Sequence, residues 1–187
     1  MANKAFILAG FLLLLAAGSP TPCAADQSDP RLDALFAQLK SADTPVAAET
    51  IQAGIWQIWS ETNDAVGATL LQRGSARLEQ GDPQGALAIF DELVKRQPDF
   101  AEGWNKRATT LYLLGRIAQS VRDIDTVLRL EPRHFGALSG LAMCDRKLGR
   151  TQDALDALRR VQAISPLQPG IADNIDALKL ELERHSI

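Results

Sequence analysis

The residues best suited to catalysis or metal binding in this sequence are two histidines, His134 and His185, and the cysteine Cys144. A metal site needs several ligands at set spacings, and no Cys, Asp or Glu stands at a familiar ligand spacing from either histidine. We therefore expect both histidines at the surface, His134 in a turn and His185 near the C-terminus. Nucleophilic catalysis at Cys144 would need a base beside it, and none is predicted, so we interpret Cys144 as a buried core thiol.

Two further residue pairs could contribute to a ligand site. Asp123 and Asp125 offer paired carboxylates, but residues two apart on a helix point in different directions, so we expect both on a solvated face. Asp125 is placed to pair with Arg129, four residues on. Trp56 and Trp59 could stack on a sugar or a base. Trp59 shares the helical stripe of nearby apolar residues and is predicted to be core, whereas Trp56 lies off that stripe and stays an open candidate.

The composition is that of a globular, helical protein. Hydrophobic residues make up 46% and charged residues 23% of the chain, as is typical of a folded domain. Aromatic residues are only 5%, and a core of Leu and Ala favours packed helices over sheets. The net charge of −3 gives no basis for binding nucleic acid, and the sequence contains no P-loop and no G-x-G-x-x-G motif. We predict no catalytic residues, no metal site and no cofactor.

The first residues have the pattern of a secretory signal. Lys4 supplies a positive start, and the uncharged apolar run from Ala5 to Ala17 is shorter than the ~20 residues that span a bilayer. Small residues precede a predicted cleavage site after Ala25, so residues 1–25 are expected to be removed as a signal peptide. A lipid anchor at Cys23 fits poorly because a proline precedes it. The mature protein is expected in an extracytoplasmic compartment, a bacterial periplasm, without a membrane span.

A 34-residue period runs through the rest of the sequence, and such a period indicates an array of equal structural units. Glycine is expected at the end of the first helix of each unit, where it adopts a left-handed conformation at least cost. Proline is expected after the second helix, and small residues where the two helices approach each other. In three successive copies the repeated residues are Pro98, Pro132 and Pro166; Gly81, Gly115 and Gly149; Gly74, Ala108 and Ala142; Ala86, Ser120 and Ala154; Leu70, Trp104 and Leu138; Phe90, Ile124 and Leu158; and Leu93, Val127 and Val161.

The second copy resembles the tetratricopeptide repeat (TPR) signature, which has the same period. The residues that carry the resemblance are Trp104, Ala108, Gly115, Ser120, Ile124, Val127 and Pro132. It implies an all-α, right-handed TPR-type helical solenoid with repeats at 67–100, 101–134 and 135–168, and Trp104 in its core. The chain departs from the family where Arg73 and Arg107 replace a leucine, and where Arg77, Leu111 and Asp145 replace a large aromatic residue. The charges imply looser packing, or neighbours that supply partners for them.

Amphipathic segments flank the three repeats. Residues 26–66 are predicted to be a linker and a degenerate helix pair, at 31–62, that caps the N-terminal end of the stack. Residues 169–187 carry one apolar stripe with polar residues behind it, which predicts a C-terminal capping helix.

The resemblance also implies where a partner binds. In the family, the first helix of each pair lines a concave groove that holds a peptide or a helix, and Tyr112 is expected as an anchor. Chaperone-binding members grip a C-terminal carboxylate, but the corresponding places here carry Leu71, Ser75, Gly136 and Gly140, so that clamp is absent. The predicted groove residues are Leu71, Ser75, Leu78, Asn105, Thr109, Tyr112, Leu113, Ser139, Met143, Arg146 and Lys147.

These features predict an exported protein–protein interaction module that binds a peptide or protein, and not an enzyme. The alternative is a structural subunit of an envelope or secretion complex, which assembles through its repeat ends and forms an oligomer on its own. In that case Trp56 or exposed apolar surface would lie in the interface. A glycan binder or an enzyme would need a site that we do not find in the sequence.

Overall fold

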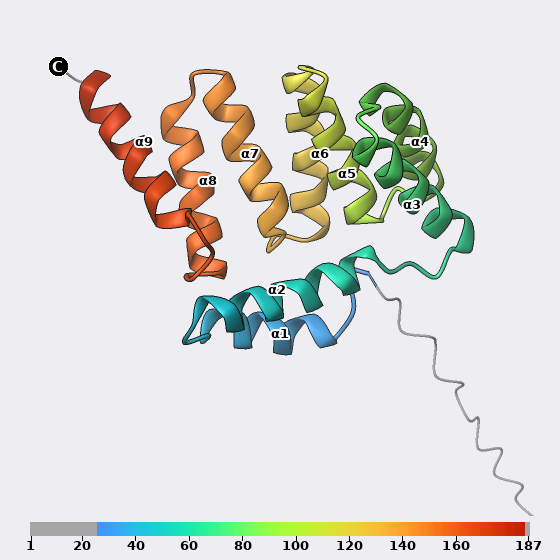
Figure 1. Cartoon of the computed structure of the whole chain (residues 1–187), viewed down its shortest axis with the longest axis horizontal. Helices are drawn as coiled ribbons and strands as arrows, with labels where there is room; N and C mark the ends of the chain where they lie inside the picture. Colours follow the sequence, from blue (N-terminus) through green and yellow to red (C-terminus); the bar gives the residue numbers. More distant parts are fainter. Residues whose placement is uncertain (1–25, 186–187) are drawn as a thin grey trace, which may run out of the picture.

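The computed structural model describes residues 26–185, which form nine α-helices and no strand (Figure 1). The helices are α1 Arg31–Lys40, α2 Pro45–Ser60, α3 Ala65–Glu79, α4 Pro83–Arg96, α5 Ala101–Leu113, α6 Ile117–Leu130, α7 Phe135–Lys147, α8 Thr151–Ile164 and α9 Ile171–His185. The predicted all-α solenoid is confirmed. The predicted signal peptide, residues 1–25, lies outside the described residues.

Local sequence explains where the repeat helices begin and end. Asp82 caps α4, because its carboxylate accepts a backbone N–H of the first turn at 2.8 Å, and Pro83 occupies a position where its missing N–H costs nothing. The first helices of the three repeats end at Gly81, Gly115 and Gly149, with φ between 71° and 73°. That left-handed conformation strongly favours glycine, which explains why glycine recurs with the period.

The pairs α3–α4, α5–α6 and α7–α8 stack in order, and α9 packs against α8 (Figure 1). Within a pair, close approach requires a small residue. A Cβ atom on Gly74 of α3 would lie 2.4 Å from a ring carbon of Phe90 in α4. Helix α9 buries Ile171, Ile175 and Leu178 and exposes its opposite face, as predicted for a capping helix.

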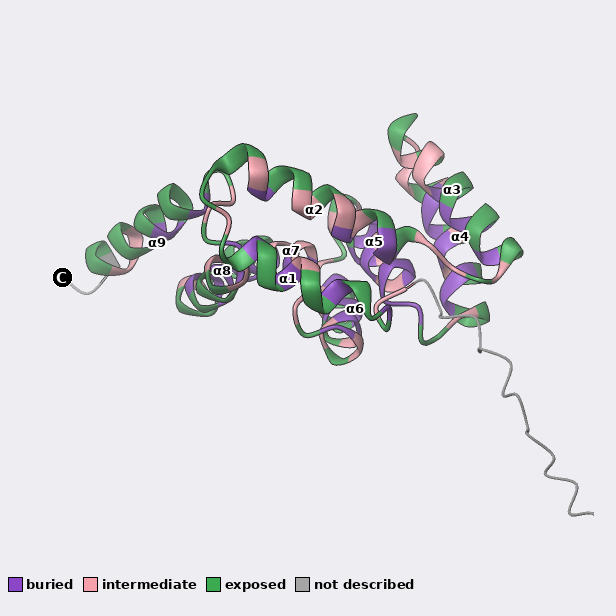
Figure 2. Ribbon diagram, turned by 90° about the horizontal axis from the view of Figure 1, so that it is seen from below, coloured by how far each residue is buried: buried purple, intermediate pink, exposed green. Residues whose placement is uncertain are grey.

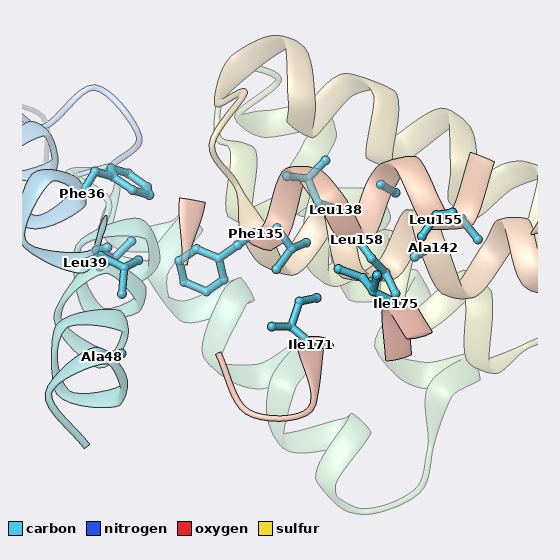
Figure 3. Packing of buried hydrophobic residues seen from close by; sticks show 14 of the residues in the cluster. Phe36, Leu39, Ala48, Phe135, Leu138, Ala142, Leu155, Leu158, Ile171 and Ile175 are labelled. Carbon is cyan, nitrogen blue, oxygen red and sulfur yellow. The ribbon is translucent and has the colours of Figure 1, made fainter. Parts of the chain in front are cut away.

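The N-terminal helix pair α1–α2 is present, but its predicted place at the N-terminal end of the stack is wrong. The two helices lie across one end of α5 to α8 (Figure 1) and share a core cluster with α7, α8 and α9 (Figure 3), whereas the core cluster of α3–α4 contains no residue from them. Aromatic packing explains this position, because Trp56 and Trp59 of α2 contact Phe135 at the start of α7, with ring centroids 5.5 and 5.1 Å apart. We call α1 and α2 together the strap.

In the view from that side, α1 and α2 lie along the row of helices from α5 to α8 (Figure 2). The strap and the segment before it contact three successive turns of the stack. The guanidinium of Arg133 lies over the ring of Phe36, 4.2 Å from its centroid. The polar contacts are Gln27 with Asp99 and Ala101, Asp33 with Arg133 at 2.7 Å, and Gln52 with Ser165 at 2.8 Å. The turns between α4 and α5, α6 and α7, and α8 and α9 are thereby held by one continuous N-terminal segment.

Candidate functional site

His134, predicted to lie at the surface, is fully buried, so that prediction is wrong. It is the N-cap of α7, where its Nδ1 accepts the backbone N–H of Ala137 at 3.1 Å. With Nδ1 acting as an acceptor, Nε2 is placed to donate to Glu102 of α5 at 3.3 Å. The imidazole also stacks on Trp59, with centroids 4.0 Å apart. Through these contacts His134 connects α5, α7 and the strap. Because its side chain has no access to solvent, it is not placed to act on a ligand.

Trp56, the open aromatic candidate, packs between the strap and α7. Its ring makes edge contacts with Trp59, His134 and Phe135 at centroid distances of 5.4, 5.3 and 5.5 Å. It also fills the space over Gly136, where a Cβ atom would lie 2.5 Å from the indole. Trp56 is therefore engaged in packing and does not form a platform for a sugar or a base, and Trp59 is core as predicted.

Asp123 is buried, so the prediction that it lies on a solvated face is wrong. Both of its oxygens accept from Arg107 at 2.7 Å, and Arg107 also donates to Asp91 at 3.0 Å. The hydrogen bonds with Asp123 raise the pKa of Arg107. Neighbours thus supply partners for the arginine that replaces a family leucine. Asp125 is exposed, but Arg129 donates to a threonine hydroxyl instead of pairing with it.

Cys144 is fully buried in α7, as predicted. Its Sγ lies 3.5 Å from the hydroxyl of Ser120, and burial raises the pKa of the thiol, which disfavours a nucleophilic thiolate. The side chain of His185 lies outside the described residues. Within the part of the chain that the structure describes, no group of three or more acidic, His or Cys residues could hold a metal ion, and no helix is long and apolar enough to cross a membrane.

The predicted groove residues of the second and third repeats come together around Met143, which is 50% exposed. Met143 borders three adjoining spaces, of about 130 Å³ between α5 and α7, 370 Å³ between α5, α7 and α9, and 220 Å³ between α7 and α9. We call these spaces together the Met143 hollow. The predicted residues that line it are Asn105, Thr109, Tyr112, Leu113, Ser139, Met143, Arg146 and Lys147.

The three residues predicted from the first repeat lie elsewhere. Leu71 is buried, and Leu78 packs with it in the core cluster of α3 and α4. Ser75 is half-buried on the same helix. None of the three borders the Met143 hollow. The structure therefore does not bring the first repeat into the same concave site as the second and third.

Helix α9 and the turn before it contribute lining residues that the sequence-based prediction missed. The repeat period could have predicted these residues, because Asn174 stands one repeat length after Gly140 and Glu181 one repeat length after Lys147. Helix α9 therefore occupies the place of a first helix in a fourth repeat, as well as covering the end of the stack. The missed lining residues include Gln168, Pro169, Asn174 and Glu181.

Charges are unevenly distributed in the Met143 hollow. Arg146 and Lys147 are exposed in the last turn of α7, where cations also interact favourably with the helix dipole. Glu181 accepts a hydrogen bond from the hydroxyl of Thr151 at 2.9 Å, which draws its carboxylate toward α8. The ion pairs among the described residues include neither Arg146 nor Lys147. Both cations therefore face the hollow without a carboxylate partner from the described chain.

Sequence relatives share the repeats. A family model described as tetratricopeptide repeat matches residues 71–121 and 106–169. A TPR repeat-containing protein of Rhizobium etli is 37% identical over 152 residues, which cover 81% of this chain and 74% of that protein. A tetratricopeptide repeat and J domain-containing co-chaperone of Fusarium oxysporum is 29% identical over 118 residues, 63% of this chain and 22% of that protein.

Solved structures share the fold. The first TPR domain of Spaghetti, bound to an HSP90 peptide, aligns with a TM-score of 0.61 at 17% identity and covers 63% of this chain and 93% of that one. The type III secretion chaperone SycD of Yersinia enterocolitica, in complex with a peptide of the translocator YopD, aligns with a TM-score of 0.57 at 13% identity, over 60% and 92% of the two chains. At these identities the likeness establishes the helical solenoid and nothing finer.

Proposed function

The chain belongs to the tetratricopeptide repeat family, and from this premise we propose that it is an exported adaptor that binds a segment of a protein partner in the Met143 hollow. The hollow is the observation that carries the proposal. Leu113 and Met143 are 60% and 50% exposed and line the same concave space. Exposed apolar side chains in a concavity with a few polar groups are typical of a binding site.

The relatives support a peptide or protein as the ligand, because two structures of the same fold contain bound peptides. The signal-like pattern of residues 1–25 supports an extracytoplasmic compartment, with a bacterial periplasm as the expected one. The chaperone clamp is not part of the proposal. Its positions in this chain include Gly136, which Trp56 covers, and Leu71, which is buried.

The test is crosslinking and capture of partners from the native envelope, comparing the intact protein with a Tyr112→Ala, Arg146→Glu double variant. A matched control is Leu180→Ala, Arg159→Glu, which makes the same kinds of change at exposed positions outside the hollow. We expect one partner to be captured by the intact protein and the control but not by the double variant, with helicity unchanged in all three. Equal capture by all three proteins would place the binding site elsewhere.

A second candidate function is that of a structural subunit that assembles through the end of the stack. The observation that favours it is the position of the strap, which packs on the later repeats and leaves α3–α4 with a separate core cluster and an exposed Val66. Sedimentation of the purified protein distinguishes the two. A strictly monomeric protein at micromolar concentration would count against assembly through this end.

A further inference from the structure

We propose that the partner segment is acidic, and that it places one apolar side chain between α5 and α7 and its Asp or Glu side chains against Arg146 and Lys147. This inference rests on the proposed function, since it names the chemistry of the segment that the Met143 hollow binds.

The strap determines which part of the concave face is open. Trp56 lies over Gly136 in the first turn of α7, and Gln52 contacts Gln168, ahead of α9, at 3.4 Å. Helix α2 also contacts α5. The beginning of the concave face is therefore occupied by the protein itself, and α7 borders the hollow only from Ser139 onward. A partner is restricted to the half of the groove that contains Arg146 and Lys147.

The space between α5 and α7 fits one apolar side chain. Its volume is about 130 Å³, close to the ~150 Å³ of an engineered apolar cavity that holds a benzene ring. Ala108 and Ile124 lie at its base, and Leu113 and Met143 are its exposed apolar walls. A leucine, methionine or phenylalanine of the partner matches this size and polarity. Tyr112 borders both this space and the next, so a chain that leaves the apolar space passes directly to the cations.

The charge of the hollow favours carboxylates. The whole chain has a net charge of −3, yet two adjacent cations, Arg146 and Lys147, line the open 370 Å³ space. Glu181 lines the same space and accepts a hydrogen bond from Thr151. Its single negative charge offsets only one of the two cations, so the residues that line this space carry a net positive charge. Complementary charge selects partners and repels those of the same sign, even where it adds little affinity. These cations lie at the opposite end of α7 from Gly136, one of the family's clamp positions.

Side-chain carboxylates are favoured over a free C-terminal carboxylate. The space beside Arg146 and Lys147 is wide and open, and it continues into the 220 Å³ space that Arg146 also borders. A chain can therefore continue past the cations, and no wall of the described hollow requires it to end there. A segment with several Asp or Glu residues engages both cations at once.

The probe is a library of random twelve-residue peptides attached to a support through their C-termini, so that no free carboxylate is present. It is incubated with the purified full-length protein. We expect the bound peptides to be enriched in a Leu, Met or Phe that is followed or preceded within a few residues by Asp or Glu. The strongest binder is then synthesised with an amidated C-terminus, and its affinity is measured by fluorescence anisotropy.

The decisive variant is Arg146→Glu, Lys147→Glu, with Arg159→Glu, Arg160→Glu as the matched control, because the control reverses two adjacent exposed cations on α8, outside the hollow. We expect the hollow variant to bind the peptide at least about tenfold more weakly, and the control to bind within about twofold. A peptide with Lys in place of its acids should show the reverse preference and bind the hollow variant better than the intact protein.

The outcomes separate the inference from the proposed function. Acidic enrichment that is lost in the hollow variant and retained in the control supports both. Enrichment of apolar peptides without acidic residues, or of basic peptides, overturns the acidic partner while leaving peptide binding in place. Enrichment of peptides that bind equally to the hollow variant also overturns it. If no peptide is enriched at all, the proposed binding of an extended segment fails as well.

Discussion

The first and third repeats share one sequence framework but have different surroundings. The core of α3–α4 is a separate cluster of its own residues and Phe100, with α5 as its neighbour in the stack. The core of α7–α8 is continuous with both strap helices on one side and with α9 on the other. In a solenoid, the stability of a repeat is the sum of its own folding and its contacts with neighbours. Two repeats that look equivalent in sequence therefore differ in stability, and we expect α3–α4 to open first.

The difference also concerns the concave face. Of the predicted groove residues, those in the second and third repeats line the Met143 hollow, whereas Leu71 and Leu78 of the first repeat pack into its core. The strap covers one end of the concave face with Trp56 and leaves the other end open. The candidate site thus lies in the region that the strap supports, in keeping with the need for a binding site to be held in place.

The largest effect is expected from Trp59→Ala, which removes the packing of the strap on His134 and Phe135 at the start of α7. Trp59 is 1% exposed and stacks on His134, so its truncation should cost about 3–5 kcal/mol in the free energy of unfolding. Hydrogen exchange, which should be slower in α7–α8 than in α3–α4 of the intact protein, should become similarly fast in both pairs of the variant. The half-buried Trp104 provides the control, as Trp104→Ala should cost less. Unchanged protection of α7–α8 would show that the strap does not stabilise it.

Two glycine substitutions should destabilise the contact between the strap and α7 and the contact between α3 and α4 separately. In Gly136→Ala the new methyl group meets Trp56 of the strap at 2.5 Å, and in Gly74→Ala it meets Phe90 at 2.4 Å. Each should cost about 1–3 kcal/mol, with faster hydrogen exchange in the strap and α7 for the former and in α3–α4 for the latter. Gly140→Ala, one turn from Gly136, meets only Ile124 at 3.5 Å and should change stability by less than about 1 kcal/mol. A large loss in this control would mean that helix α7 tolerates no side chain here, whatever the strap does.

A smaller effect is expected at acidic pH in the first repeat. Asp64 caps α3 and pairs with Arg96 of α4, and this hydrogen bond lowers the pKa of Asp64 below its ordinary value of 3.8. A carboxyl whose pKa is lower in the folded state adds stability above its unfolded pKa, and that stability is lost as the pH falls through the folded pKa. Between pH 7 and pH 3, α3–α4 should therefore lose more protection in the intact protein than in Asp64→Asn. Arg96→Gln should reduce the pH dependence in the same way; if it leaves the dependence intact, the ion pair is not its source.

The smallest expected effect is a change in the alkylation rate of Cys144, which reports how often the third repeat opens. The thiol is fully buried in α7, and burial raises its pKa, so alkylation of the native protein should be slow. Labelling should be faster in Trp59→Ala and unchanged in Gly74→Ala, because only the former weakens the region around α7. Equal labelling in the two variants would show that the repeats open together.

Much of the fold could be predicted because the period depends on local geometry. A glycine with positive φ ends each first helix, and Gly74 fits only where Phe90 crosses it, so these residue types recur at fixed intervals. The concave position of Tyr112 and Met143 could be predicted from the resemblance for the same reason. The role of α9 in the hollow was missed, although Glu181 stands one repeat length after Lys147.

The amino-acid sequence alone determined the helix pairs, their order, their terminating glycines and the polar capping helix, because each depends on neighbours within one repeat length. Only the tertiary structure decided the position of the strap, the burial of His134 and the pairing of Arg107 with Asp123. Asp33 and Arg133 are 100 residues apart, and an amphipathic helix pair has an apolar face whether it covers the first repeat or crosses the later ones. The choice follows from side-chain shape, since Trp56 and Trp59 fit around Phe135 and His134, and no periodic pattern contains that information.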